Sequence, residues 1–118
     1  MRPKDQGTRW ESAIVTSAMA FGIDARRIAE GGQNDLGDIQ LDVPNGDIWI
    51  LEAKHRTNLN THQTLRAAKK KAPAYANVAV IWKKSVRKAG NQNRTPDGEP
   101  SVVILDLPTF LTLIGDNQ

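Results

Sequence analysis

The sequence predicts a single α/β domain in which one mixed β-sheet of about five strands is flanked by helices. Three observations lead to this fold class. The chain has 118 residues, a length typical of one domain. Apolar residues recur at a helical period in some segments and alternate with polar residues in others. The predicted elements follow the order helix, three strands, helix, two strands, helix, which one sheet with helices on its faces accommodates.

The first element should be a helix that begins at Thr8, after a flexible lead over residues 1–7. Thr8 and Glu11 have the spacing of a capping box. The apolar residues that follow, Ile14 among them, form one stripe at the helical period. The helix should end next to Gly22, because glycine readily adopts the left-handed conformation found at helix C-termini.

Three strands are expected next, over residues 25–29, 38–43 and 47–54. The second and third form the clearest hairpin of the sequence, through a turn at residues 44–46 that contains proline and glycine. Polar and apolar residues alternate in the first arm, which predicts one solvent-exposed face. The second arm is almost entirely apolar through Leu51, as is typical of a central strand covered on both faces.

A second helix should span residues 60–75, with Asn60 as its N-cap and Pro73 at or near its end. The remaining predictions are a strand over residues 78–82, a basic loop over residues 84–100, a buried strand over residues 102–105 and a short helix over residues 108–114. All these elements are assigned to one domain over residues 1–118.

Positive charge is concentrated in residues 53–96, which hold eleven lysines and arginines and no acidic residue, whereas residues 1–52 hold nine of the 13 acids. A field of one sign suits a polyanion, because each neutralised phosphate releases a condensed counterion. The alternative is a solvated basic face that serves solubility. The candidate phosphate contacts are Arg9, Arg26, Arg27, Arg56, Lys69, Lys70, Lys71, Lys83, Lys84, Arg87 and Lys88.

Several classes of protein are excluded by composition. The absence of cysteine excludes disulfide scaffolds, thiolate zinc sites and cysteine nucleophiles. No apolar run approaches the ~18 residues of a membrane span, and the first residues lack the apolar segment of a secretory signal. We therefore expect a cytoplasmic protein that does not contact a membrane.

The hairpin register places two carboxylates and a lysine together. If the turn pairs Val43 with Asp47, paired residue numbers sum to 90 and Asp38 lies opposite Glu52. Lys54 then lies on the same face, two residues further along. Mg²⁺ accepts one or two carboxylates, and a bound ion would polarise a phosphoryl oxygen and activate water. The alternative is that Asp38 only opens a strand and that Glu52 and Lys54 form a simple ion pair.

Glu11 is a third candidate acid, because it lies within the apolar arc of the first helix. Two roles are open to its side chain. As a capping-box residue it would accept a hydrogen bond from the Thr8 amide. Alternatively, it would point over the sheet toward Asp38 and complete a metal shell.

Asp38 followed by Glu52-Ala53-Lys54, with Glu11 upstream, resembles the PD-(D/E)XK nuclease signature. The segments around residues 7–11 and Arg26-Arg27 resemble Holliday junction resolvases of the archaeal type and their phage and actinobacterial relatives. The resemblance implies a restriction-endonuclease-like fold. It also implies a homodimeric endonuclease that depends on Mg²⁺, with Mn²⁺ as a substitute, and that resolves four-way DNA junctions by symmetric cuts in a bacterial or archaeal cell, or on behalf of a phage.

The resemblance, which covers about residues 7–114, also assigns roles to single residues. The implied metal ligands are Asp38, Glu52, the Ala53 carbonyl and, through water or a second metal, Glu11. Lys54 would be the catalytic lysine, and Arg27 would lie near the scissile phosphate. The sequence departs from the motif at Gly37, where the name of the motif has proline.

Three alternatives concern substrate and assembly. Other nucleases with the same motif nick DNA, cut flaps or restrict duplexes, and a non-catalytic DNA-binding module would use the basic stretch without metal. Aromatic residues make up only 5% of the chain, which favours contacts to the DNA backbone over base stacking on single strands. The apolar residues between 102 and 114 are either part of a dimer interface or a core strand and its packing helix.

Overall fold

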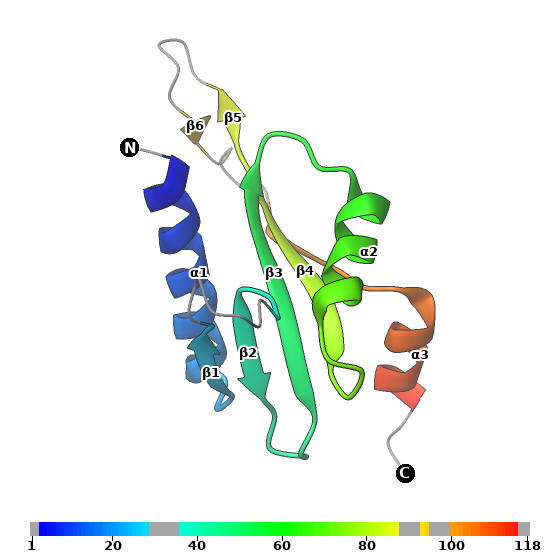
Figure 1. Cartoon of the computed structure of the whole chain (residues 1–118). Coiled ribbons are helices and arrows are strands. Elements are labelled where there is room, and N and C mark those ends of the chain that lie inside the picture. Colours follow the sequence, from blue (N-terminus) through cyan, green and yellow to red (C-terminus); the bar gives the residue numbers. More distant parts are fainter. Residues whose placement is uncertain (1–2, 29–35, 88–92, 95–99, 116–118) are drawn as a thin grey trace.

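The computed structural model describes residues 3–28, 36–87, 93–94 and 100–115. Five strands form one mixed sheet in the order β1-β2-β3-β4-β7, and three helices accompany it. Figure 1 shows α1 on one side of the sheet and α2 and α3 on the other. The predicted fold class, a mixed sheet of about five strands flanked by helices, is confirmed. Among the helices so described, none is long and apolar enough to cross a bilayer.

Helix α1 spans Pro3–Ala20, so the predicted start at Thr8 is wrong. Residues 3–7 of the predicted flexible lead are helical, and residues 1–2 lie outside the described residues. Proline is well accepted in the first turn of a helix, where its missing N–H costs no hydrogen bond, and the helix therefore begins there. The predicted end is confirmed. Gly22 has a φ of 79°, and the Ile23 amide donates to the Ala18 carbonyl at 3.1 Å, as in a Schellman motif.

The three strands that follow are β1 (Asp24–Arg27), β2 (Ile39–Asp42) and β3 (Ile48–Arg56), paired antiparallel in that order. In the turn between β2 and β3, the Val43 amide donates to the Asp47 carbonyl at 2.9 Å, and Gly46 has a φ of 99°. Ile39 pairs with Leu51, so the predicted register, in which paired numbers sum to 90, is confirmed.

Helix α2 (Thr61–Lys71) connects β3 to the parallel strand β4 (Asn77–Lys84). The predicted cap is confirmed, since the Asn60 side chain accepts from the Gln63 amide at 3.1 Å. The helix ends four residues earlier than predicted. Ala72 is extended, with ψ at 151°, because the residue before a proline is disfavoured in the helical conformation.

The chain after β4 differs most from the prediction. Within the predicted loop over residues 84–100, Lys84 belongs to β4, and β5 (Val86–Arg87) pairs with β6 (Asn93–Arg94). Strands of two residues show no alternation of polar and apolar side chains that a sequence could reveal. Residues 88–92 and 95–99 lie outside the described residues.

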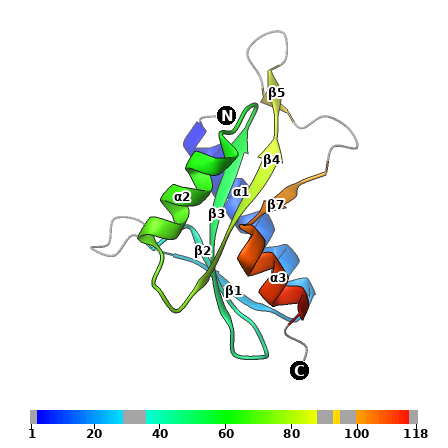
Figure 2. The same ribbon diagram turned by 90° about the vertical axis from the view of Figure 1, so that its right-hand side faces the viewer.

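Strand β7 (Val102–Ile104) pairs with β4 at the edge of the sheet, and the prediction that it is buried is wrong. Val103 is 60% exposed, because an edge strand has a neighbour on one side only. Helix α3 (Leu107–Gly115) follows β7 directly (Figure 2). Its first turn is capped by the Asp106 side chain, which accepts from the Thr109 amide at 2.9 Å.

The core consists of two apolar layers on opposite faces of β3 and β4. Ile14 of α1 packs against Ile39, Leu51 and Ala79 on one face, and Ala68 of α2 packs against Val78 and Val80 on the other. On this second face α2 covers β4, while the β2 positions that point the same way are the polar Gln40 and Asp42. The α2 face of the sheet is therefore polar over β2 and apolar over β4, with β3 between.

Candidate active site

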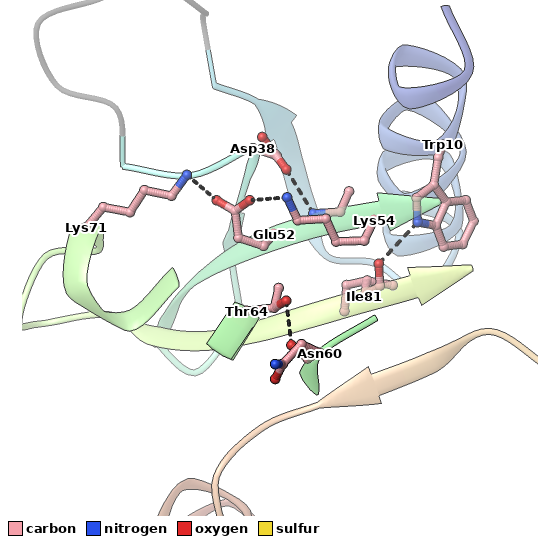
Figure 3. Close-up of polar contacts among 9 residues, drawn as sticks. Trp10, Asp38, Glu52, Lys54, Asn60, Thr64, Lys71 and Ile81 are labelled. Atoms are coloured by element: carbon pink, nitrogen blue, oxygen red, sulfur yellow. Dashed lines mark hydrogen bonds and ion pairs between the residues drawn. The ribbon is translucent and has the colours of Figure 1, made fainter. Parts of the chain in front are cut away.

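Asp38, Glu52 and Lys54 come together on the α2 face of the sheet, where β2 begins and β3 passes its middle (Figure 3). The Asp38 amide donates to the Leu51 carbonyl at 3.0 Å, which continues the hairpin register by one residue. The Asp38 carboxylate accepts a hydrogen bond from the Ala53 amide at 2.9 Å. The β3 backbone thus holds this carboxylate beside Glu52.

Gly37 permits the close approach of the two strands at this point. Its φ of 145° is one that residues with a side chain rarely adopt. A Cβ atom at this position would lie 2.5 Å from the Ile50 Cγ2 atom and 3.7 Å from the Glu52 Oε1 atom. The residue that precedes Asp38 is therefore restricted to glycine by both its conformation and its surroundings.

Glu52 is buried, with an exposed fraction of 6%, and two ammonium groups face its carboxylate. Lys54 Nζ lies 3.7 Å from Oε2, and Lys71 Nζ lies 2.6 Å from Oε1. Burial raises the pKa of Glu52, and the neighbouring Asp38 charge acts in the same direction, while the two lysines oppose this shift. The charged form of a carboxylate in such surroundings is strongly stabilised by cationic partners.

Sequence reasoning predicted Lys71 as a surface phosphate contact and missed its place against Glu52. The spacing of residues along the second helix could have indicated this contact. Lys71 follows Ala68 by three positions and Thr64 by seven, which puts all three residues on the helix face that turns toward the sheet. A lysine at the end of a buried helix face can reach inward, because its long stem places the charge well away from the helix axis.

A cavity of about 320 Å³ opens from Glu52 along α2. It is lined by Glu52, Lys54, Arg56, Asn58, Leu59, Asn60, Gln63, Thr64, Ala67, Ala68 and Lys71. The polar residues at the start of α2 were not predicted as part of a site, because only the β3–α2–β4 crossover brings them into one cavity with Glu52.

Glu11 lies elsewhere. Its carboxylate binds Arg27 Nε at 3.0 Å, and Arg27 pairs with Ile39 and shares the face of the sheet that α1 covers. The predicted capping-box role is wrong, because Thr8 lies inside α1 rather than at its start. Within the ranges that the structure describes, no group of three or more acidic or histidine side chains is placed to hold a metal. Only Asp38 and Glu52 of the three predicted acids are brought together.

The predicted phosphate contacts divide into separate groups. Arg9, Arg26 and Lys70 are exposed, and Arg26 binds Asp42 at 3.0 Å. Lys69 binds Asp106, and the Lys83 ammonium lies 5.3 Å from the centre of the Trp10 ring. The remaining predicted contacts are Arg56 and Lys84, which pair across β3 and β4, Arg87 in β5, and Lys88, which lies outside the described residues.

The charged end of the sheet extends the cavity. Arg56 lines the cavity and pairs with Lys84 of β4, whose side chain shares its face of the sheet, whereas Lys83 lies on the other face, over Trp10. Positive side chains therefore continue from the carboxylates toward the ends of β3 and β4. An anionic polymer lying along the cavity would meet them in succession.

The oxygen atoms of this site fit a divalent cation. Mg²⁺ is commonly held by one or two carboxylates together with water and substrate oxygens, and Asp38 and Glu52 supply two carboxylates from adjoining strands.

No family model and no curated protein matches the chain. Among solved structures, the chain is similar to Hjc of Archaeoglobus fulgidus, a Holliday junction resolvase from an archaeal hyperthermophile. The two sequences are 20% identical, the TM-score is 0.47, and the match covers 96% of this chain and 98% of the other.

Proposed function

We propose that this protein is a divalent-cation-dependent endonuclease that cuts DNA at four-way junctions. The observation that carries the proposal is the convergence of Asp38, Glu52 and Lys54, the last two of which line a cavity together with Arg56. Two carboxylates and an amine in one place are what metal-assisted hydrolysis of a phosphodiester requires.

Each side chain has a role that its position supports. Asp38, Glu52 and the Ala53 carbonyl are the proposed ligands of Mg²⁺ or Mn²⁺, which when bound would polarise a phosphoryl oxygen and lower the pKa of a water molecule. The Ala53 amide holds Asp38 in position. Lys54, with its ammonium beside Glu52, orients the attacking water and offsets the negative charge that develops on the phosphate.

The choice of DNA as substrate is supported by the distribution of charge. Arg56 lines the cavity, and Lys84 pairs with it at the ends of β3 and β4, so the two offer a path for the sugar-phosphate backbone. The choice of a four-way junction comes from the motif resemblance around residues 7–54, because the active-site residues alone are compatible with any branched or duplex DNA.

The experiment that tests the function compares a synthetic four-way junction, a duplex and a single strand, each with and without Mg²⁺. We expect symmetric cuts in the junction alone, and only with Mg²⁺. Cuts in the duplex or in the single strand would show that this protein is a nuclease with another substrate. Binding without any cut would favour a non-catalytic DNA-binding module, a second candidate that the neutralisation of Glu52 by two lysines also supports.

We further propose that the protein acts as a homodimer, since two symmetric cuts need two sites related by a two-fold axis. The supporting observation is an exposed apolar stripe on α3. Leu107, Phe110, Leu111 and Ile114 have helical spacing and are each between 45% and 65% exposed. Apolar stripes of this kind on a surface are typical of protein interfaces.

Phe110→Asp is expected to convert the dimer to a monomer, because a charge in the middle of the stripe would have to be buried without a partner. Analytical ultracentrifugation should show the mass fall by half, while circular dichroism remains that of the parent. Thr112→Asp is the matched control, since Thr112 lies on α3 away from the stripe and its variant should remain dimeric. An unchanged mass for Phe110→Asp would place the interface elsewhere.

A further inference from the structure

Lys71 contacts the carboxylate that the proposed function assigns to the metal. Its ammonium lies 2.6 Å from the Glu52 Oε1 atom, while Lys54 approaches the other oxygen, Oε2, at 3.7 Å. Figure 3 shows the two ammonium groups on opposite sides of the carboxylate, one from α2 and one from β3. Glu52 is thus held between cations from two different elements of the fold.

A divalent cation on the Glu52 Oε1 atom would lie close enough to the Lys71 ammonium for the two to repel each other. A Mg²⁺ ion lies about 2.1 Å from its oxygen ligands, so an ion on Oε1 would be within about 5 Å of an ammonium that contacts the same atom. Like charges at this separation repel strongly where water is largely excluded, and the side chain of Glu52 is only 7% exposed. The two cations therefore compete for this oxygen.

The position of Lys71 allows it to leave without disturbing the fold. It is the last residue of α2, and the cap of the helix end is the Ala72 amide, which donates to the Ala68 carbonyl. Its side chain is 35% exposed, so the stem can rotate toward solvent. Lys54 is different, because it extends from the central strand β3 and its contact with Glu52 is longer.

We propose that Lys71 competes with the divalent cation for Glu52 and thereby weakens cation binding in the DNA-free protein. The inference rests on the proposed function, because it takes Glu52 as a metal ligand. Lys71 is then a positioning residue that holds the Glu52 carboxylate in place until the cation arrives. A DNA phosphate in the adjoining cavity gives the released ammonium another anionic partner, which couples cation binding to DNA binding.

The test is a calorimetric titration of Mn²⁺ into the DNA-free protein. Lys71→Met is expected to bind Mn²⁺ about fivefold more tightly than the parent or better, because the repulsion between two nearby cations is removed. Lys70→Met is the matched control for the general loss of one positive charge, since Lys70 is the exposed neighbour on the same helix. Lys71→Arg retains a cation at the site and should bind as the parent does.

Thermal unfolding distinguishes competition between Lys71 and the cation from a role of Lys71 in stability alone. Without metal, Lys71→Met should unfold at a lower temperature than the parent, because a buried carboxylate loses a partner. Mn²⁺ should then raise its unfolding temperature more than it raises that of the parent. A role of Lys71 in folding alone would not produce this larger response. Lys71→Gln, which retains polar contact without charge, serves the same purpose if the methionine variant does not fold.

The failure of the inference is distinguishable from the failure of the proposed function. Asp38→Asn should remove Mn²⁺ binding by the parent. If it does so, but Lys71→Met binds Mn²⁺ no more tightly than Lys70→Met does, the competition is refuted and the metal site stands. If neither the parent nor Lys71→Met shows binding that depends on Asp38, the metal site itself is refuted, and the inference with it.

Discussion

Asp38→Asn is expected to reduce Mg²⁺-dependent cleavage of a four-way junction by about 10³-fold or more, since a metal ion contributes several kcal/mol to such reactions and each ~1.4 kcal/mol is a factor of ten. The substitution removes the charge and preserves the shape. The oxygen of an asparagine side chain can still accept the hydrogen bond from the Ala53 amide, so the hairpin should remain intact. Cleavage rates and DNA affinity are measured in parallel, and the affinity should persist.

Asp47→Asn is the matched control for this variant. Asp47 lies in the turn at the far end of the same hairpin, is exposed, and its replacement removes the same charge from the molecule. We expect it to cleave as the parent does. Full activity of Asp38→Asn, or an equal loss in both variants, would contradict the assignment of Asp38 to the metal.

Gly37→Ala is expected to lower the free energy of unfolding by about 2–6 kcal/mol, as the sum of backbone strain and overpacking, each of about 1–3 kcal/mol. The strain arises from its φ of 145°, and the overpacking from a new Cβ 2.5 Å from the Ile50 Cγ2 atom. Because Gly37 precedes Asp38, the relaxation of this contact should also displace the carboxylate. Urea denaturation measures the first effect, and cleavage well below the unfolding temperature measures the second.

Gly46→Ala isolates the contribution of the backbone. Gly46 also has a positive φ, at 99°, but a Cβ there meets nothing within 4 Å. Its variant should lose only the strain energy, about 1–2 kcal/mol, and should keep full activity. Equal losses of stability in the two variants would show that the contact with Ile50 carries no cost.

The conformation of Gly37 also explains why the sequence departs from the proline in the name of the motif. Proline fixes φ near −65°, which is incompatible with a φ of 145°. In this chain the strand before Asp38 is shaped by glycine, and Gly37→Pro should be at least as damaging as the alanine variant.

The hairpin that carries the site could be predicted because its signals are local. Alternation in the first arm, an apolar second arm and a turn with glycine at its end together fix one register, and that register places Asp38 beside Glu52. The caps at Asn60 and Gly22 were equally local, since each depends on hydrogen bonds within a few residues. These predictions needed no knowledge of tertiary packing.

The predictions that failed depended on choices that the sequence leaves open. The capping box at Thr8 is a good signal for a helix start, but the helix begins earlier, at Pro3. Glu11 therefore has no capping role, and its carboxylate binds Arg27. Val103 is apolar enough for a core strand, but its place at the edge of the sheet leaves it exposed. The contact between Lys71 and Glu52 arises only when the crossover brings α2 back over the sheet.

The crossover from β3 through α2 to β4 affects which parts of this sequence can be exchanged during evolution. The two carboxylates and both lysines of the site lie in one continuous stretch between residues 38 and 71. If α1, or the whole chain after β4, were exchanged by recombination, the order of residues and the lengths of the loops between residues 38 and 71 would not change. These four side chains would therefore be inherited together, whatever sequence flanks them.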